Sequence, residues 1–423
     1  MDLEALETAV RWQALYLAGR AVQQRLNADL SDAEIEARCE CGQLARYAGR
    51  REKTFQSVLG PLKLQRAYFH CAACGRGFYP RDRQLGLENT SLSPAVTRMV
   101  GAVGAIVSFQ EGSQLLHELA GVTVNARQVE RLAEALGAEI AEDERQNVQP
   151  LEDMPLPAIL YLGVDGTGIP MRCSEVQGRT GKQPDGSAKT REVKLCTVWS
   201  AEARDAQGRP VRDEGSVTYT AAIESAATAD TDKTPAAFTQ RVLREALRRR
   251  FTQAERTVVL GDGAPWIWNM AQELFPRAVQ IVDRFHAQQH LSEVSKAIYG
   301  GDSKLARDWA QRRHEELDSG RLADLLRALR RHAERSEEAR KCFQYIHRNR
   351  DRMRYPAFEA MELCTSTGVV EAGCKVAIGT RLKRAGMHWS AAGANSIIAL
   401  RCCRLSGRFQ DFWERRSERQ NAA

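Results

Sequence analysis

The order of apolar runs and amphipathic segments in the middle of this chain admits few sheet topologies. In order, these segments are strands at 158–164, 193–201 and 216–223, a helix at 235–249, a strand at 256–260, a helix at 266–274 and a strand at 278–282. Three strands joined by hairpins and then helix, strand, helix, strand is the ribonuclease-H-like order. The sequence therefore predicts an α/β domain of that class.

Two aspartates stand where apolar strands of this domain end. Asp165 and Asp262 each follow an apolar strand and precede a glycine, and Glu371 begins a late helix after a long helical stretch. Asp-Gly also starts ordinary turns, and for either aspartate alone that interpretation is the better one. Together, on strands that are adjacent in this fold, the three carboxylates form a candidate triad for two Mg²⁺ ions in phosphoryl transfer.

Four cysteines bracket a short hairpin nearer the N-terminus. Strand-like runs at 54–59 and 62–69 meet at a Gly-Pro turn, and the cysteines on either side of them are Cys39, Cys41, Cys71 and Cys74. The chain has eleven cysteines, which is an odd number, and it shows no export signal. Both observations disfavour a disulfide framework. We expect a zinc ribbon with one structural Zn²⁺, although the first pair is one residue shorter than usual and free thiols are the alternative. His70 is a possible substitute ligand, but it is better explained as the end of the strand.

A helical module follows the cysteine region. Helices are expected at 93–106, 110–119 and 125–139, with a tight turn at 120–122, in a helix-turn-helix pattern. Arg127 and Gln128 lie at the start of the third helix, where side chains can reach base edges or phosphates. Trihelical packing without any DNA contact is an equally good interpretation.

The charge distribution favours a nucleic-acid partner. The net charge is +7, with ten basic against five acidic residues at 36–90 and ten against three at 372–423. Arginine provides most of the positive charge, and its planar fork suits phosphate. No run of about 18 apolar residues and no signal-peptide pattern is present, so we expect a soluble cytoplasmic protein.

Five runs of sequence carry a resemblance to a known family. They are YLGVDGTGIPM (161–171), VLGDGAPWIW (259–268), VDRFH (282–286), TGVVEAGCK (367–375) and RLKRAGMHW (381–389). In this order they resemble bacterial insertion-sequence DDE transposases of the ISKra group, which are related to Mutator-like enzymes. The resemblance covers nearly the whole chain, and the cysteine head and helical module also fit it.

The resemblance implies a DDE transposase that binds terminal inverted repeats, cleaves 3′ ends and transfers them to target DNA. It makes Asp165, Asp262 and Glu371 the catalytic ligands of two Mg²⁺ (or Mn²⁺) ions. It also implies a bacterial, nucleoid-associated homo-oligomer with double-stranded DNA as partner. A catalytically silent DNA-binding regulator and a metal-dependent nuclease without joining activity stay open as alternatives.

Other residues near the carboxylates have weaker assignments. For Asp283 and His286 we expect a supporting role beside the metal ligands, while replacement of Asp262 by Asp283 and a separate metal with His290 stay open. The further candidate DNA contacts are Lys182, Lys375, Lys383 and Arg384. The glycine-rich loop around Lys182 lacks the spacing of a nucleotide-binding loop, so no nucleotide cofactor is expected.

The expected architecture is a multidomain α+β chain. Its segments are N-terminal helices at 1–38, a zinc-ribbon-like DNA-binding head at 39–84, a helix-turn-helix-like helical domain at 85–145, a ribonuclease-H-like (retroviral-integrase-like) catalytic domain beginning at 146–286, an all-helical insertion at 287–362, and the end of the catalytic domain with a basic tail at 363–423.

Overall fold

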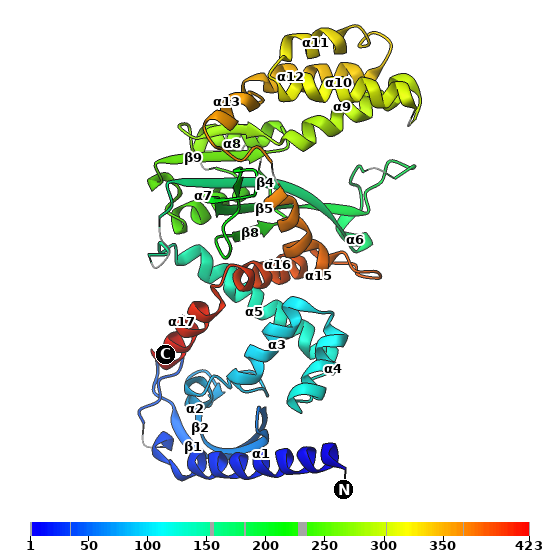
Figure 1. Cartoon of the computed structure of the whole chain (residues 1–423). Helices are drawn as coiled ribbons and strands as arrows, with labels where there is room; N and C mark the ends of the chain where they lie inside the picture. Colours follow the sequence, from blue (N-terminus) through cyan, green and yellow to red (C-terminus); the bar gives the residue numbers. More distant parts are fainter. Residues whose placement is uncertain are drawn as a thin grey trace. The chain divides into compact units, whose positions relative to one another are not determined.

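The structure is a computed structural model of a mixed α+β chain (Figure 1). It describes residues 2–33, 35–152, 156–181, 183–226, 235–301, 303–366 and 368–422. The chain divides into two compact units, one formed by residues 1–140 and 408–423 and the other by residues 141–407. The second unit is thus inserted into the sequence of the first.

The first unit begins with a long helix against a β-hairpin. Its elements are α1 (Leu3–Ala28), η1 (Ser31–Ala33), β1 (Arg46–Ser57), β2 (Gly60–His70), β3 (Gly77–Phe78) and α2 (Pro80–Gln84). The expected helical pattern extended to about residue 37, but α1 ends at Ala28. Asp29 Oδ1 accepts hydrogen bonds from the backbone and the hydroxyl of Ser31, and this local turn competes with continuation of the helix.

The hairpin turn also differs from the expectation. Ser57 pairs with Gly60, so residues 58 and 59 form the two-residue loop and the Gly-Pro pair already belongs to β2. Ser57 Oγ donates to the Gly60 carbonyl at 2.7 Å and accepts from the Leu59 amide at 3.1 Å. Gly60 adopts φ +99°, a conformation that is strained for residues with a side chain.

The helices α3 (Pro94–Ile106), α4 (Phe109–Ala120) and α17 (Phe409–Ala422) complete the first unit together with most of α5 (Ala126–Gln146), whose last residues belong to the second unit. Ser108 and Glu111 form a capping box at the start of α4, and Gly121 ends the helix in the left-handed region at φ +66°. Buried apolar residues from α3, α4 and α5 form one core. The α17 helix joins this unit through Arg416, whose guanidinium contacts Glu139 at 3.0 Å.

The second unit is built on a five-stranded sheet. Its strands are β4 (Ile159–Pro170), β5 (Thr190–Ser200), β8 (Thr218–Ala222), β9 (Arg256–Gly261) and β10 (Val279–Val282), with a separate pair β6 (Ala203–Arg204) and β7 (Pro210–Val211). The order is β10-β9-β4-β5-β8. The pairs β4–β9 and β9–β10 are parallel, while β4–β5 and β5–β8 are antiparallel. The central strands read as nearly continuous apolar runs because they are buried on both faces.

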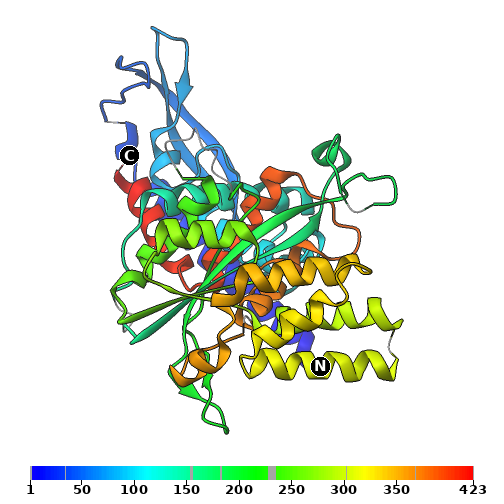
Figure 2. The same ribbon diagram turned by 90° about the horizontal axis from the view of Figure 1, so that it is seen from above.

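Helices surround this sheet and extend from it. They are α6 (Cys173–Val176), α7 (Ala237–Arg248), η2 (Phe251–Gln253), α8 (Pro265–Leu274), α9 (Arg284–Tyr299), α10 (Lys304–Asp318), α11 (Leu322–Arg330), α12 (Glu337–Asn349), η3 (Arg350–Arg352), α13 (Tyr355–Ala360), α14 (Gly368–Gly373), the π-helical segment η4 (Cys374–Gly379), α15 (Thr380–Leu382) and α16 (Ala391–Leu405). The helices α10 and α12 lie beside α9 (Figure 2), so residues 284–360 form the helical stretch expected between the fifth strand and Glu371.

Candidate metal centre and carboxylate site

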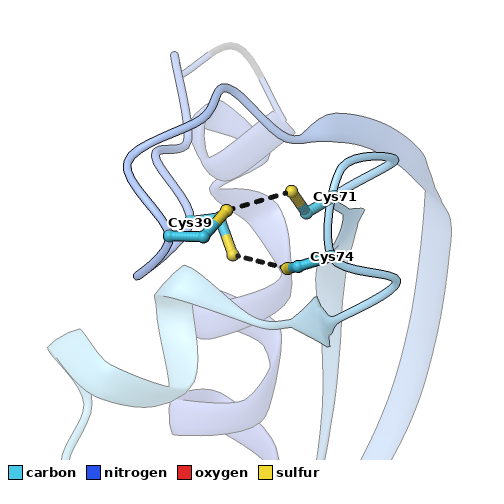
Figure 3. A group of neighbouring side chains, drawn as sticks. Cys39, Cys71 and Cys74 are labelled. Atoms are coloured by element: carbon cyan, nitrogen blue, oxygen red, sulfur yellow. Dashed lines mark hydrogen bonds between the residues drawn. The ribbon is translucent and has the colours of Figure 1, made fainter.

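The four cysteines of the head converge from two loops (Figure 3). The Sγ atoms of Cys39 and Cys74 lie 3.5 Å apart, those of Cys41 and Cys71 lie 3.6 Å apart, and all four lie within 4.8 Å of one another. These distances are too long for disulfides, whose sulfurs are about 2.05 Å apart. Four thiolates about 2.3 Å from one zinc ion at tetrahedral angles lie roughly 3.8 Å apart. The cluster therefore fits a structural metal ion, with zinc as the consistent choice.

Both cysteine loops are tight turns that end in a glycine with positive φ. Gly42 donates to the Cys39 carbonyl at 2.8 Å, and Gly75 donates to the Cys71 carbonyl at 2.9 Å. The shorter spacing of the first pair is therefore accommodated, since the loop still returns both sulfurs to the cluster. The structure does not place His70 in the cluster, because His70 is the exposed last residue of β2.

The second cysteine loop favours a thiolate at Cys71. A hydrogen bond from the backbone of Cys74 is the main cause that lowers the pKa of Cys71 to about 7, and the thiol of Cys41 adds to the effect. A hydrogen bond from the Arg76 backbone lowers the pKa of Cys74, but its contacts with the thiols of Cys39 and Cys71 outweigh this effect. The pKa of Cys74 is therefore raised to about 11. A divalent metal ion that binds these four sulfurs would displace the protons of the thiols.

Two of the candidate carboxylates lie where the parallel pairing of β4 with β9 ends in the second unit. The parallel β4–β9 register ends with Val164 paired with Gly261, and Asp165 and Asp262 are the next residues. Asp262 follows β9 as expected, but Asp165 lies inside β4, which does not end before this aspartate and continues to Pro170 beside β5. Asp165 Oδ1 accepts from the Gly166 amide at 2.7 Å, and Asp262 Oδ1 accepts from the Ala264 amide at 2.8 Å. Burial raises the pKa of Asp165, and the negative charge of Asp262 adds to the rise. The two carboxylates are thus close enough for their charges to repel each other, and Asp165 is partly buried.

The helix that carries Glu371 packs directly on this sheet. Val370 is fully buried and fills the space above Gly163, where an added Cβ would lie 2.1 Å from Val370 Cγ2. One turn later, the Cys374 thiol donates to Asp165 Oδ2 at 3.4 Å. Burial raises the pKa of Cys374, so this thiol stays protonated and acts as a donor. The segment with Glu371 is therefore fixed beside Asp165.

Glu371 itself points into solvent and has a cationic partner. Lys375 Nζ lies 2.8 Å from Glu371 Oε1, and this contact is the main cause that lowers the pKa of Glu371. His286 has a minor electrostatic effect on the pKa of both Glu371 and Asp165, which it lowers. Over the part of the chain that the structure describes, only the cysteines form a group of three or more ligands within 4.8 Å. The structure does not bring Asp165, Asp262 and Glu371 to that spacing.

Asp283 occupies a helix cap. It is buried, its amide donates to the Gly261 carbonyl at 2.8 Å, and its Oδ1 accepts from the His286 amide at 2.9 Å as the N-cap of α9. His290 lies one turn further along, and its ring packs at a tilt of 56° against Tyr345, with 4.6 Å between the ring centroids. These contacts support a structural function for Asp283.

Sequence reasoning missed Tyr345, which comes from the helical insertion. Its hydroxyl donates to the Asp262 carbonyl at 2.8 Å, and a Cβ on Gly263 would lie 2.4 Å from its ring. Gly263 adopts φ +97°, which lets the chain turn under the ring. The missed signal was the glycine itself, since only a glycine combines this backbone angle with so close an aromatic neighbour. Cys374 was also missed, although it stands three residues after Glu371.

The candidate DNA contacts lie in both units. Arg127 is exposed at the start of α5, whereas Gln128 Oε1 accepts from the Asn125 amide at 3.2 Å and Asn125 Oδ1 accepts from the Gln128 amide at 2.9 Å. Gln128 therefore caps the helix with its oxygen. Lys383 donates to Thr167 Oγ1 on β4, two residues after Asp165.

The structure describes one of the two remaining basic candidates. Lys182 lies outside the described residues, and Arg384 is half-buried after α15. A cavity of about 620 Å³ beside β5 is lined by Arg179, Arg191 and Lys194 together with two glutamates. In the residues that the structure describes, Arg179 and Arg191 form no ion pair, whereas Lys194 contacts Glu192 at 2.9 Å.

Comparisons with known proteins give limited information. Residues 230–419 match the family described as "Uncharacterised protein family (UPF0236)". No curated protein matches. Among solved structures, the chain is similar to the Drosophila P element transposase strand transfer complex, with 10% identity, a TM-score of 0.27, and coverage of 80% of this chain and 84% of that chain. No described helix is long and apolar enough to cross a membrane.

Proposed function

We propose that the chain is a DDE transposase of an insertion sequence, related to the ISKra group, with a ribonuclease-H-like catalytic domain. The observation that carries this proposal is the pairing of Val164 with Gly261, which makes Asp165 and Asp262 neighbours at the carboxyl edge of the sheet. The strand order β10-β9-β4-β5-β8, with one antiparallel half, supports the fold assignment. The sequence resemblance supports the choice of reaction.

The chemistry of the carboxylate pair supports divalent metal ions. Burial and the charge of Asp262 both raise the pKa of Asp165, and a cation between the two aspartates relieves this repulsion. Glu371 would complete the set from α14 after exchange of its Lys375 partner for metal. Two bound Mg²⁺ or Mn²⁺ ions would activate the attacking oxygen and stabilise the leaving oxygen of an in-line phosphoryl displacement.

The chain's own residues orient these ligands and bind DNA. Cys374 donates to Asp165, and Tyr345 donates to the loop of Asp262, so each aspartate is held by a second element. Lys383 donates to the hydroxyl of Thr167, two residues after Asp165, and from this position its ammonium group can contact a phosphate.

DNA recognition is assigned in this proposal to the zinc head and the helical module. The head presents exposed basic side chains around a metal-stabilised hairpin, and Arg127 opens α5. Terminal repeats are the proposed ligand, and target DNA would follow the basic groove beside β5. A homo-oligomer that pairs two DNA ends is part of the proposal.

The test is DNA cleavage and strand transfer with the sequences that flank the gene. Asp165→Asn, Asp262→Asn and Glu371→Gln should each abolish both reactions with Mg²⁺, because each removes a charged metal ligand. Binding of the same DNA should persist. Glu273→Gln, at an exposed carboxylate of α8, is the matched control and should behave as wild type.

The outcomes separate the alternatives. Cleavage without joining by the wild-type protein would identify a nuclease. DNA binding without cleavage by any variant, wild type included, would identify a silent regulator. If Asp262→Asn cleaves normally while Asp283→Asn is folded and inactive, the second catalytic aspartate is Asp283.

A further inference from the structure

The second unit contains another cavity, which shares no lining residue with the basic groove beside β5. Its volume is about 650 Å³, within the usual range of pockets that bind small organic groups. It lies between the β6–β7 pair, the first turn of α9 and residues 362–366 after α13. Cys364 holds these last residues in place, because its amide donates to the Tyr161 hydroxyl at 3.2 Å and its thiol donates to the Pro210 carbonyl at 3.4 Å.

This cavity is close to the carboxylate site. Gly368 lines it and begins α14, the helix that carries Glu371. Trp199 lines it as well and pairs in the β4–β5 register with Tyr161, which stands four residues before Asp165 on β4. Four residues of a strand span about 13 Å. A DNA strand with one phosphate at Asp165 can therefore bring a nearby nucleotide to the cavity.

The lining of the cavity includes an exposed aromatic ring. Phe285, in the first turn of α9, is 58% exposed, whereas the other described Phe, Tyr and Trp side chains of the second unit are buried or half-buried. The guanidinium of Arg284 lies 5.9 Å from the centre of this ring. Every nucleobase has a flat face that can stack on such a ring, and a neighbouring arginine adds to the attraction.

Two polar groups of the lining have no partner among the described residues. Trp199 is fully buried, and its Nε1–H forms no hydrogen bond, which is unusual for a buried donor. Arg212 is exposed and forms no ion pair, whereas Arg209 beside it is paired with Asp205 at 2.9 Å. An acceptor atom of a base would complete the indole donor, and a phosphate would neutralise Arg212. One nucleotide supplies both groups.

We propose that this cavity binds one unpaired nucleobase of the DNA strand that is processed at the carboxylates, with the base stacked on Phe285 and a phosphate at Arg212. The inference rests on the proposed function, which makes DNA the substrate. A free nucleoside triphosphate fits less well, because Arg212 is the one cation of the lining without an acidic partner. A protein partner also fits less well, because Phe285 and Val211 are the exposed large apolar residues of the lining, and protein interfaces bury about 800 Å² on each side.

The first test measures binding of a duplex with a short single-stranded tail to the zinc-loaded full chain, with Ca²⁺ in place of Mg²⁺ to prevent cleavage. Removal of one base of the tail, as an abasic site, should raise the dissociation constant about fivefold to a hundredfold at one position. Phe285→Ala should weaken binding of the intact tail by a similar factor and should abolish the effect of the abasic site, because both changes remove the same contact. Phe285→Trp should bind as wild type. Leu305→Ala, at a leucine of α10 that is 66% exposed, is the matched control and should change neither affinity.

A second test concerns the phosphate. Arg212→Gln should reduce the slope of the logarithm of affinity against the logarithm of salt concentration by about 0.7, because one contact to a single strand is lost. An unchanged slope overturns the assignment of Arg212.

The remaining outcomes separate this inference from the proposed function. Equal binding of intact and abasic tails at every position, or an abasic effect that Phe285→Ala leaves unchanged, overturns the inference. Deoxyadenosine monophosphate that displaces the tail at equal concentration would identify a pocket for free nucleotides and overturn it as well. If the wild-type chain cleaves and joins DNA without any abasic effect, the proposed function stands and the pocket assignment falls. A folded chain that binds no DNA removes both.

Discussion

Gly163 lies on β4 beneath α14, and a methyl group added there would push this helix off the sheet. In Gly163→Ala the new Cβ would lie 2.1 Å from Val370 Cγ2 and 2.8 Å from the Trp199 ring. Carbon atoms in contact lie about 3.5–4.0 Å apart, so α14 must retreat by roughly 1.5 Å. Overpacking of this kind should reduce the free energy of unfolding by about 1–3 kcal/mol.

The same displacement should reach the proposed chemistry. Glu371 follows Val370 on α14, so it moves with the helix away from Asp165 and Asp262. A misplacement of about 1 Å lowers reaction rates by roughly a hundredfold. The assay is the rate of Mg²⁺-dependent DNA cleavage by Gly163→Ala, measured beside its urea unfolding curve.

Two further variants make this prediction specific. Gly168→Ala on the exposed part of β4 brings its Cβ only to 3.2 Å from Thr190 Oγ1 and should keep wild-type activity. Val370→Ala in the Gly163→Ala background removes the colliding methyl and should recover most of the rate. A folded Gly163→Ala protein that cleaves at the wild-type rate, or a defect that the second substitution leaves unchanged, would refute the reasoning.

Three more predictions follow from contacts already described. The purified chain should contain one zinc per molecule, and chelation should unfold residues 39–80 by circular dichroism while residues 141–407 stay folded; a content below about half an equivalent would contradict this. Asp165→Asn should raise the melting temperature of metal-free protein at pH 7. The raised pKa of Asp165 means that the folded state holds its proton to higher pH than the unfolded state, so stability falls as pH rises, and the gain should vanish below about pH 4. Tyr345→Phe removes the hydrogen bond to the Asp262 carbonyl and should cost about 1–2 kcal/mol in urea unfolding, with slower cleavage; an unchanged curve would count against that contact.

The succession of strands and helices along the chain was accessible from sequence because each element depends on a local pattern. The apolar runs before Asp165 and Asp262 match β4 and β9, although β4 continues six residues further, to Pro170. The register that makes the two aspartates neighbours depends on pairing across about 97 residues, and no local pattern encodes it. Sequence alone therefore named the two aspartates as candidates, and the structure supplies their positions relative to each other.

The positions of side chains that reach the site from other elements were not accessible. Tyr345 donates to a backbone carbonyl 83 residues earlier in the chain. Cys374, the first residue of the π-helical η4, contacts Asp165 across 209 residues. The ion pair between Glu371 and Lys375 was visible as a four-residue spacing, but whether lysine or metal is the partner depends on what is bound.

The insertion of residues 141–407 into the first unit has a consequence for synthesis. Phe409 of α17 packs against Gly101 of α3, and Arg416 binds Glu139, so the N-terminal unit is incomplete until residues 408–422 have been made. Domains usually fold in the order in which they leave the ribosome. In this chain the unit that is synthesised first cannot be completed until the whole of the second has been made. A truncation after residue 407 should therefore destabilise the unit with the four cysteines more than the unit with the five-stranded sheet.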